Sequence, residues 1–101
     1  MAETPTTVRA ARAIQAERSM SALNRRMNGE HLPRRPQWQC QMCEPDTPWP
    51  CHPARVHLAE AYGRDRIGLS MYVGGLLFIV AMELPDVAPA ELYERFVAWT
   101  R

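Results

Sequence analysis

The most apolar stretch of the chain is residues 67–82, which contain no charged side chain. Asp65 precedes this run and Leu84-Pro85 follows it, and such residues are typical of the beginning and the end of a helix. The run has sixteen residues, whereas a membrane-spanning helix needs about 20 apolar ones. We therefore expect a helix from Asp65 to Leu84 that is buried on most of its sides, and no membrane partner.

A shorter helix is predicted before this run. Pro53 is suited to a first helical position, and Gly63 is typical of the residue just beyond a helix, so the segment is expected to be helical through Tyr62. Val56 and Ala59, together with Tyr62, are spaced to form its buried stripe.

Pro89 begins the last predicted helix, which runs through Trp99. Leu92, Phe96 and Trp99 lie at positions i, i+4 and i+7, so they form one apolar face that closes the core. No segment of the chain alternates between apolar and polar residues, as a half-buried strand would. The expected fold class is all-α.

The N-terminal segment is rich in alanine and arginine. Thr4-Pro5 is typical of a helix start and Asn28-Gly29 of a helix end. We expect residues 1–29 to form a surface helix or arm, beside a helical domain of residues 30–101 with about three core helices. The apolar residues at helical spacing in this segment are Val8, Ala11, Ile14, Met20, Leu23 and Met27.

Charge is divided unevenly along the chain. Its 101 residues carry 12 basic and 11 acidic side chains, and every basic one is arginine, which excludes catalysis by lysine. Residues 1–35 have seven arginines and three glutamates, a net charge of +4, whereas residues 36–101 have a net charge of −3. The arginines are spread around the predicted helix without interleaved aromatic residues, so a protein partner is favoured over nucleic acid bound through residues 1–29. They are Arg9, Arg12, Arg18, Arg25, Arg26, Arg34 and Arg35.

A segment of different composition joins the two parts. Residues 31–53 contain six of the nine prolines, two of the three tryptophans and all three cysteines. Cys40 and Cys43 form a C-x-x-C turn, which places two thiolates at adjacent corners of a zinc tetrahedron, and Cys51 follows closely enough to add a third. The spacing therefore predicts a structural Zn²⁺ site.

A closed zinc site needs a fourth ligand, and the sequence offers three histidines. His31 is favoured, since Pro33 and Pro36 stiffen the return of the chain toward the cysteines. His57, in the second turn of the following helix, is an alternative, and so are His52 or water. Chelation by both Cys51 and His52 is awkward, because neighbouring side chains diverge.

The tryptophans repeat one pattern, since each lies two residues before a cysteine. Trp38 precedes Cys40 and Trp49 precedes Cys51 in this way. We expect both indoles to shield the thiolates from water and to pack the metal-binding loop onto the helices.

The sequence gives little support for an enzyme or for a secreted protein. The chain has no H-E-x-x-H motif, no glycine-rich phosphate loop and no nucleophile elbow, so an enzyme is not the expected class. An odd number of cysteines and an N-terminus unlike a signal peptide predict a cytoplasmic protein with reduced thiols.

The motifs W-x-C-x-x-C (Trp38–Cys43), W-P-C (Trp49–Cys51) and Ala54-Arg55 resemble those of a group of small actinobacterial proteins. The similarity extends through Leu92-Tyr93-x-Arg95-Phe96-x-x-Trp99 and covers about residues 30–101. Members of this group often carry the label flavin reductase, and the resemblance implies that activity as an alternative. Val73-Gly74-Gly75 is, however, not a G-x-G-x-x-G fingerprint and lies inside the apolar helix.

The cysteine pattern is also similar to that of WhiB-like iron–sulfur regulators, which place a C-x-x-C and a later cysteine ahead of a helix. This likeness implies a redox-active cluster as a further alternative. A [4Fe–4S] cluster usually takes four cysteines, and the chain has three.

Overall fold

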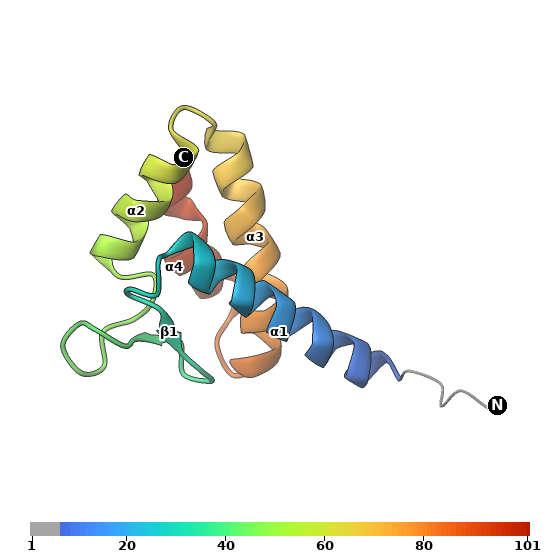
Figure 1. The fold of residues 1–101 in the computed structure, drawn as a ribbon. Helices are drawn as coiled ribbons and strands as arrows, with labels where there is room; N and C mark the ends of the chain where they lie inside the picture. The colour runs from blue at the N-terminus through green and yellow to red at the C-terminus, as the bar shows by residue number, and fades with distance from the viewer. Residues whose placement is uncertain (1–6) are drawn as a thin grey trace.

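Four α-helices pack together, and a loop that carries a very small antiparallel ladder lies at one edge of them (Figure 1). The computed structural model describes residues 7–101. The elements in chain order are α1 (Val8–Arg26), β1 (Pro33–Arg34), β2 (Gln39–Cys40), α2 (His52–Tyr62), α3 (Arg66–Glu83), α4 (Pro89–Phe96) and the 3₁₀ helix η1 (Ala98–Thr100). The protein is all-α, as the sequence predicts.

Helices α2 and α3 form a hairpin, with α4 packed behind them (Figure 1). The turn between α2 and α3 depends on Gly63, whose positive φ of 57° is costly for a residue with a Cβ. Asp65 then caps α3 by accepting a hydrogen bond from the Gly68 N–H at 2.8 Å. The predicted boundaries of both helices agree with the structure to within one residue.

The buried stripe of α2 differs from the predicted one. Ala54 and Leu58 are fully buried, whereas Val56 is 41% exposed. Ala59 and Tyr62 are partly buried against the core. The prediction is wrong for Val56 because the helix turns its Ala54–Leu58 edge inward, toward the cluster that holds both tryptophans.

Helix α3 is apolar on all sides but buried on only one. Five of its 18 residues are buried, namely Leu69, Val73, Leu76, Ile79 and Val80. The expectation of burial on most sides is therefore wrong. By length and composition alone, α3 is apolar enough to cross a membrane, a test that core helices of soluble proteins also pass.

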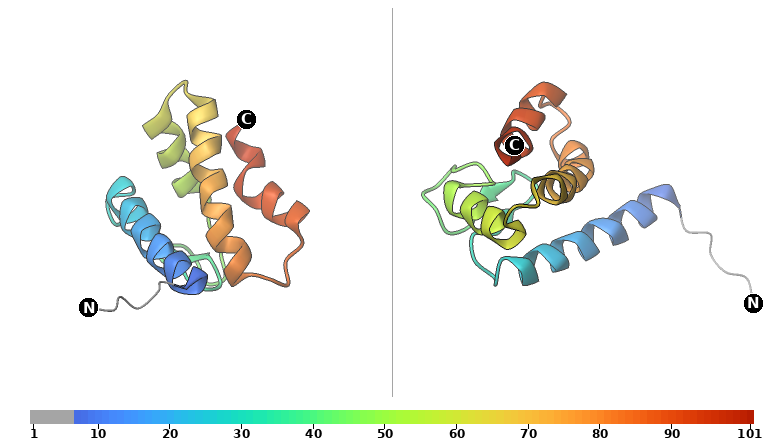
Figure 2. Two further views of the ribbon diagram at one scale, coloured as in Figure 1. Left: turned by 90° about the vertical axis from the view of Figure 1, so that its right-hand side faces the viewer. Right: turned by 90° about the horizontal axis from the view of Figure 1, so that it is seen from above.

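Helix α1 lies across the others and projects beyond them at its N-terminal end (Figure 2). Thr7 caps it by accepting a hydrogen bond from the Ala10 N–H, and the predicted start at Thr4-Pro5 lies outside the described residues. Residues 8–15 are exposed, whereas Leu23 and the following Met27 are buried in the core. Only the second half of the helix is therefore anchored.

The anchored end of α1 is held by polar contacts as well. The guanidinium of Arg26 lies 5.1 Å from the ring centroid of Tyr62 on α2 and 4.5 Å from that of Tyr72 on α3. The His57 Nε2 atom hydrogen-bonds to the Arg26 carbonyl at 2.8 Å. These contacts fix the last turn of α1 against two other helices.

The C-terminal helix is shorter than predicted. α4 ends at Phe96, and Ala98–Thr100 form η1. Phe96 and Leu92 are buried as expected, and Trp99 packs partly buried against the core. The break lets the buried Thr100 share a 2.5 Å hydrogen bond with Ser70 of α3.

The sequence did not predict the β ladder, because each strand has only two residues. Pro33 pairs with Cys40 and Arg34 with Gln39, in antiparallel register. Gln39 also bridges to Pro48. This small ladder folds the loop that carries the three cysteines back on itself.

Replacing Leu23 with alanine should test the docking of α1. Leu23 is fully buried, so L23A is expected to lower the free energy of unfolding by about 3 kcal/mol in chemical denaturation. The matched variant I14A lies in the projecting half, where the side chain is 48% exposed, and should change stability by less than about 0.5 kcal/mol. Equal effects of the two substitutions would contradict the docked position of α1.

Candidate metal centre

Three cysteines and one histidine converge at the base of the loop. One ligand atom from each of His31, Cys40, Cys43 and Cys51 lies within 4.8 Å of all the others. Cys40 and Cys51 are buried, and the other two residues are partly exposed. The cluster has the composition and the proximity to hold a metal ion.

The separations of the ligand atoms match a tetrahedral single-ion site. The His31 Nδ1 atom lies 3.4, 3.5 and 3.6 Å from the sulfurs of Cys40, Cys43 and Cys51. With Zn–S near 2.3 Å and Zn–N near 2.0 Å, a regular tetrahedron places nitrogen and sulfur about 3.6 Å apart. The sulfurs of Cys40 and Cys51 are 3.5 Å apart, near the roughly 3.8 Å edge of the same figure.

The backbone around His31 brings its ring over the cysteines. His31 has a positive φ of 50°, which is uncommon for a residue other than glycine and turns the chain sharply after α1. The ladder then continues with a hydrogen bond from the Gln41 N–H to the Leu32 carbonyl at 3.0 Å. In this register His31 lies opposite Met42, between Cys40 and Cys43 along the chain, and its ring reaches the sulfurs of both cysteines.

The C-x-x-C turn and the start of α2 supply the thiols. The Met42 N–H points at the Cys40 sulfur at 3.4 Å, a contact that stabilises a thiolate. Cys51 is the N-cap of α2, and Pro53 occupies the first turn as predicted. A thiolate at a helix N-terminus is favoured by the helix dipole.

The three thiols have different acidities without a metal. Burial raises the pKa of Cys40, but hydrogen bonds from the Met42 N–H and from His31 outweigh it and lower the value to about 7. Burial raises the pKa of Cys51 to about 12, and the hydrogen bond with Cys40 raises that of Cys43. Cys40 is therefore the thiol that ionises first.

An aromatic cluster joins the loop to α4. Trp38, Trp49 and Phe96 are completely buried, and their ring centroids lie 5.8 to 6.1 Å apart. The Trp49 Nε1–H donates a 2.7 Å hydrogen bond to the carbonyl of His31, so this indole holds the backbone of one cluster residue. Both tryptophans thus pack the loop onto the helices, as their spacing predicts.

Arg95 of α4 holds both tryptophans by their backbone. Its Nε–H donates to the Trp49 carbonyl at 2.9 Å, and Nη2 donates to the Trp38 carbonyl. Each tryptophan precedes a cysteine by two residues, so one guanidinium contacts both cysteine-bearing segments. A divalent metal ion bound by three thiolates would have a net charge of −1, opposite in sign to the guanidinium of Arg95.

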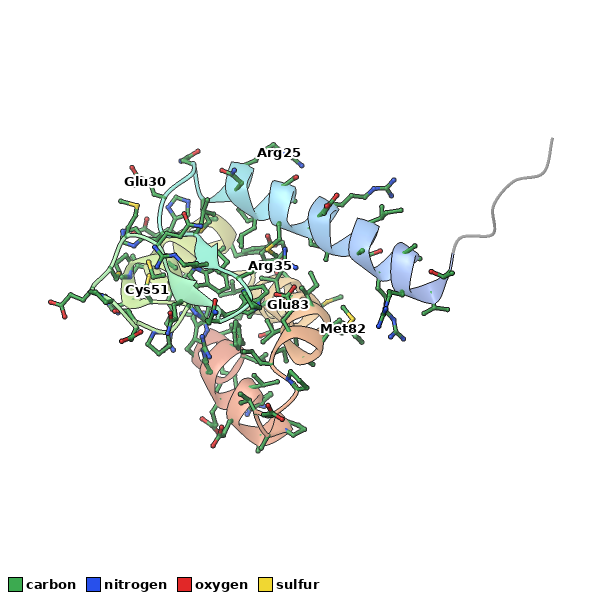
Figure 3. All side chains as sticks on the ribbon, turned by 90° about the horizontal axis from the view of Figure 1, so that it is seen from below. Arg25, Glu30, Arg35, Cys51, Met82 and Glu83 are labelled. Carbon is green, nitrogen blue, oxygen red and sulfur yellow. The ribbon has the colours of Figure 1, made fainter. Side chains whose placement is uncertain are left out.

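A second polar group holds the other edge of the loop. Glu83, at the end of α3, accepts hydrogen bonds from the Trp38 Nε1–H at 2.8 Å and from the guanidinium of Arg35. Figure 3 shows Arg35 and Glu83 side by side between the loop and α3. Trp38 has a positive φ of 56°, an unusual conformation for a bulky residue, and these contacts maintain it.

The structure does not bring the other two histidines to the cluster. His57 lies on α2 and bonds to the end of α1, and His52 is exposed at the first position of α2. Sequence reasoning missed the positioning roles of Arg95 and Glu83. In the sequence, Arg95 was marked only by its position in the motif Leu92-Tyr93-x-Arg95-Phe96-x-x-Trp99.

Comparison with known proteins gives no family assignment. The chain matches no protein-family model, no curated protein and no solved structure. Its function is therefore argued from the cluster itself.

Substitution of single histidines by alanine should identify the fourth metal ligand. Among residues 7–101, His31 is the only histidine in the cluster with the three cysteines. In H31A, metal stoichiometry by native mass spectrometry should therefore fall well below one per chain, or affinity should drop by about 100-fold or more. The matched variant H57A removes a ring outside the cluster and should keep one metal. Metal retained at full affinity by H31A would contradict this ligand set.

Loss of the Arg95 guanidinium should loosen the loop without removing a ligand. R95M leaves two carbonyls without their charged donor, and the free energy of unfolding should fall by about 2 kcal/mol. R64M, at an exposed arginine between α2 and α3, serves as the control and should be nearly neutral. Equal denaturation midpoints for the two variants would show that Arg95 does not stabilise the fold.

Proposed function

We propose that this chain is a zinc-stapled helical module that acts by binding another protein. The observation that carries the proposal is the convergence of His31 Nδ1 with three cysteine sulfurs at tetrahedral spacing. Three thiolates and one imidazole are a usual ligand set of structural zinc sites. The zinc holds the loop, and the surface of the module does the binding.

The spacing of the sulfurs favours one zinc ion over an iron–sulfur cluster. In a cluster, each cysteine binds a different iron atom or shares an iron with one other cysteine, so the sulfurs of a set do not all surround one point. Here the imidazole nitrogen lies 3.4 to 3.6 Å from all three sulfurs, a distance that suits one central ion. Thiolate-rich tetrahedral sites of this kind select zinc.

The ligand set also favours a structural over a catalytic role. Four protein ligands complete a tetrahedron and leave no position for a substrate or an activated water. Two of the four ligand residues, Cys40 and Cys51, are also buried. The flavin alternative gains no support, because Gly74 and Gly75 lie in the middle of α3 rather than in a phosphate-binding loop.

The contacts and the distribution of the arginine side chains favour a protein partner over nucleic acid. Two of the seven in the basic segment are engaged within the molecule, since Arg26 stacks on two tyrosines and Arg35 pairs with Glu83. The others are dispersed around α1 and the loop rather than aligned as a phosphate-binding stripe. A module with three thiols is suited to a reducing compartment, and we propose that it works in the cytoplasm.

Metal analysis before and after chelation tests the proposal. The purified chain should carry one Zn²⁺ and have no visible absorption, and a strong chelator should lower its melting temperature by at least 10 °C. Structural zinc sites contribute about 10–16 kcal/mol, as much as the whole stability of a small domain. Tryptophan near-UV circular dichroism should be lost together with the metal.

Three outcomes would contradict the proposal. A chain without bound metal whose melting is unchanged by chelator would exclude a structural site. Iron and sulfide with visible colour would indicate the cluster alternative, and a bound flavin would indicate the redox enzyme. Addition of excess Zn²⁺ after chelation is the control for nonspecific effects of the chelator, because it should restore the original melting temperature.

A further inference from the structure

The outward face of α3 carries a row of large apolar side chains. Ile67, Met71 and Phe78 are 76%, 71% and 79% exposed, and Met82 is 45% exposed. They recur every three to four residues together with Gly74-Gly75, so they form one stripe along the helix, opposite the buried face. We refer to this set as the α3 stripe. No charged residue interrupts it.

The α3 stripe is symmetric about its two glycines. Met71 and Phe78 lie at equal distances on either side of the midpoint between Gly74 and Gly75, and so do Ile67 and Met82. A two-fold axis through that midpoint, perpendicular to the helix, exchanges the members of each pair. Two antiparallel copies of α3 would therefore bring Met71 against the Phe78 of the other copy.

We propose that two copies of this chain associate through their α3 stripes, antiparallel, with Gly74 and Gly75 at the crossing point. Such an interface is isologous, because the same surface of each copy contacts the same surface of the other. Ile67 of one copy then lies near Met82 of the other. A crossing angle near 20° keeps both pairs in contact along the helices.

The glycines provide the space that this arrangement needs. A Cβ atom built on Gly74 or on Gly75 meets no other atom within 4 Å, so the helix backbone at the centre of the stripe is accessible to a neighbour. Small residues at a crossing point let two helices approach closely, while the flanking Phe78 and Met71 fill the space on either side.

Helix α1 extends the same face. A groove of about 900 Å³ lies between the exposed half of α1 and α3 from Gly74 onward, with Gly75, Phe78 and Met82 among its lining residues. A partner helix that crosses at the glycines therefore also lies beside α1. Figure 3 shows Met82 on the turn next to Glu83, on the side of α3 that α1 crosses. At about 200 Å² for a large side chain, the four stripe residues alone expose roughly 500 Å². Even with the walls of the groove, the face is smaller than the roughly 800 Å² per partner of a standard interface, an area that suits a weak, concentration-dependent dimer.

The pattern favours a second copy over a lipid surface. A bilayer selects for apolar area rimmed by basic and aromatic anchors, and it imposes no symmetry along a helix. The α3 stripe has no tryptophan, tyrosine or charged residue, but it has matched pairs around a central gap. Two uncharged stripes also meet without like-charge repulsion.

Sedimentation velocity of the zinc-loaded chain over a micromolar to submillimolar range tests the interface. The wild type should form a concentration-dependent dimer, and F78E should weaken it by about 100-fold. The matched control V56E places the same charge on the exposed surface of α2 and should not change the dimer. M71E is a second disruptive variant, and metal content with circular dichroism verifies that each variant is folded.

Charge exchange tests the antiparallel register. In the double variant M71R/F78E, each arginine faces a glutamate of the other copy, so the dimer should recover at least tenfold relative to F78E. A double variant no tighter than F78E would overturn the register. A wild type that stays monomeric at every concentration would overturn the proposal, and so would a monomer that instead cosediments with anionic phosphatidylserine vesicles. These outcomes are independent of whether zinc is the bound metal.

Discussion

The convergence of four ligand atoms on one point is the constraint on which the rest of this structure depends. The loop from His31 to Cys51 has only two short strands, so few backbone hydrogen bonds define its path. Three of its residues, His31, Trp38 and Asp46, have positive φ values, which an unconstrained chain seldom adopts. A metal ion that binds residues from both ends of this loop would fix the path of the backbone, which few backbone hydrogen bonds define.

Side chains from the loop form the centre of the hydrophobic core against which the helices pack. Trp38 and Trp49 are the largest buried side chains, and both come from the loop rather than from a helix. They pack against Phe96 of α4, and polar contacts from Arg95 and Glu83 hold them at their backbone and at an indole nitrogen. The metal centre and the hydrophobic core are therefore one unit, and damage to either should disturb the other.

Sequence patterns predicted much of this architecture. Proline, glycine and aspartate located the ends of α2 and α3, because these residues act on the local backbone. The proximity of His31 to the cysteines also followed from spacing. Burial was harder to predict, because α3 has apolar residues on every side. The sequence alone does not distinguish Val73, which faces the core, from Phe78, which faces solvent. The contacts of Arg95 join residues about 50 positions apart and leave no periodic trace in the sequence.

The connection between α1 and the cluster is short, since residues 27–30 alone separate Arg26 from His31. The buried Leu23 and Met27 anchor the end of α1 directly before this connection and fix the direction in which the helix leaves the body (Figure 2). That helix forms one wall of the groove beside α3, so only residues 27–30 separate a wall of the groove from a residue of the cluster. The chain thus places a candidate metal centre and an open apolar groove at the two ends of one helix, although the groove contains none of the four cluster residues.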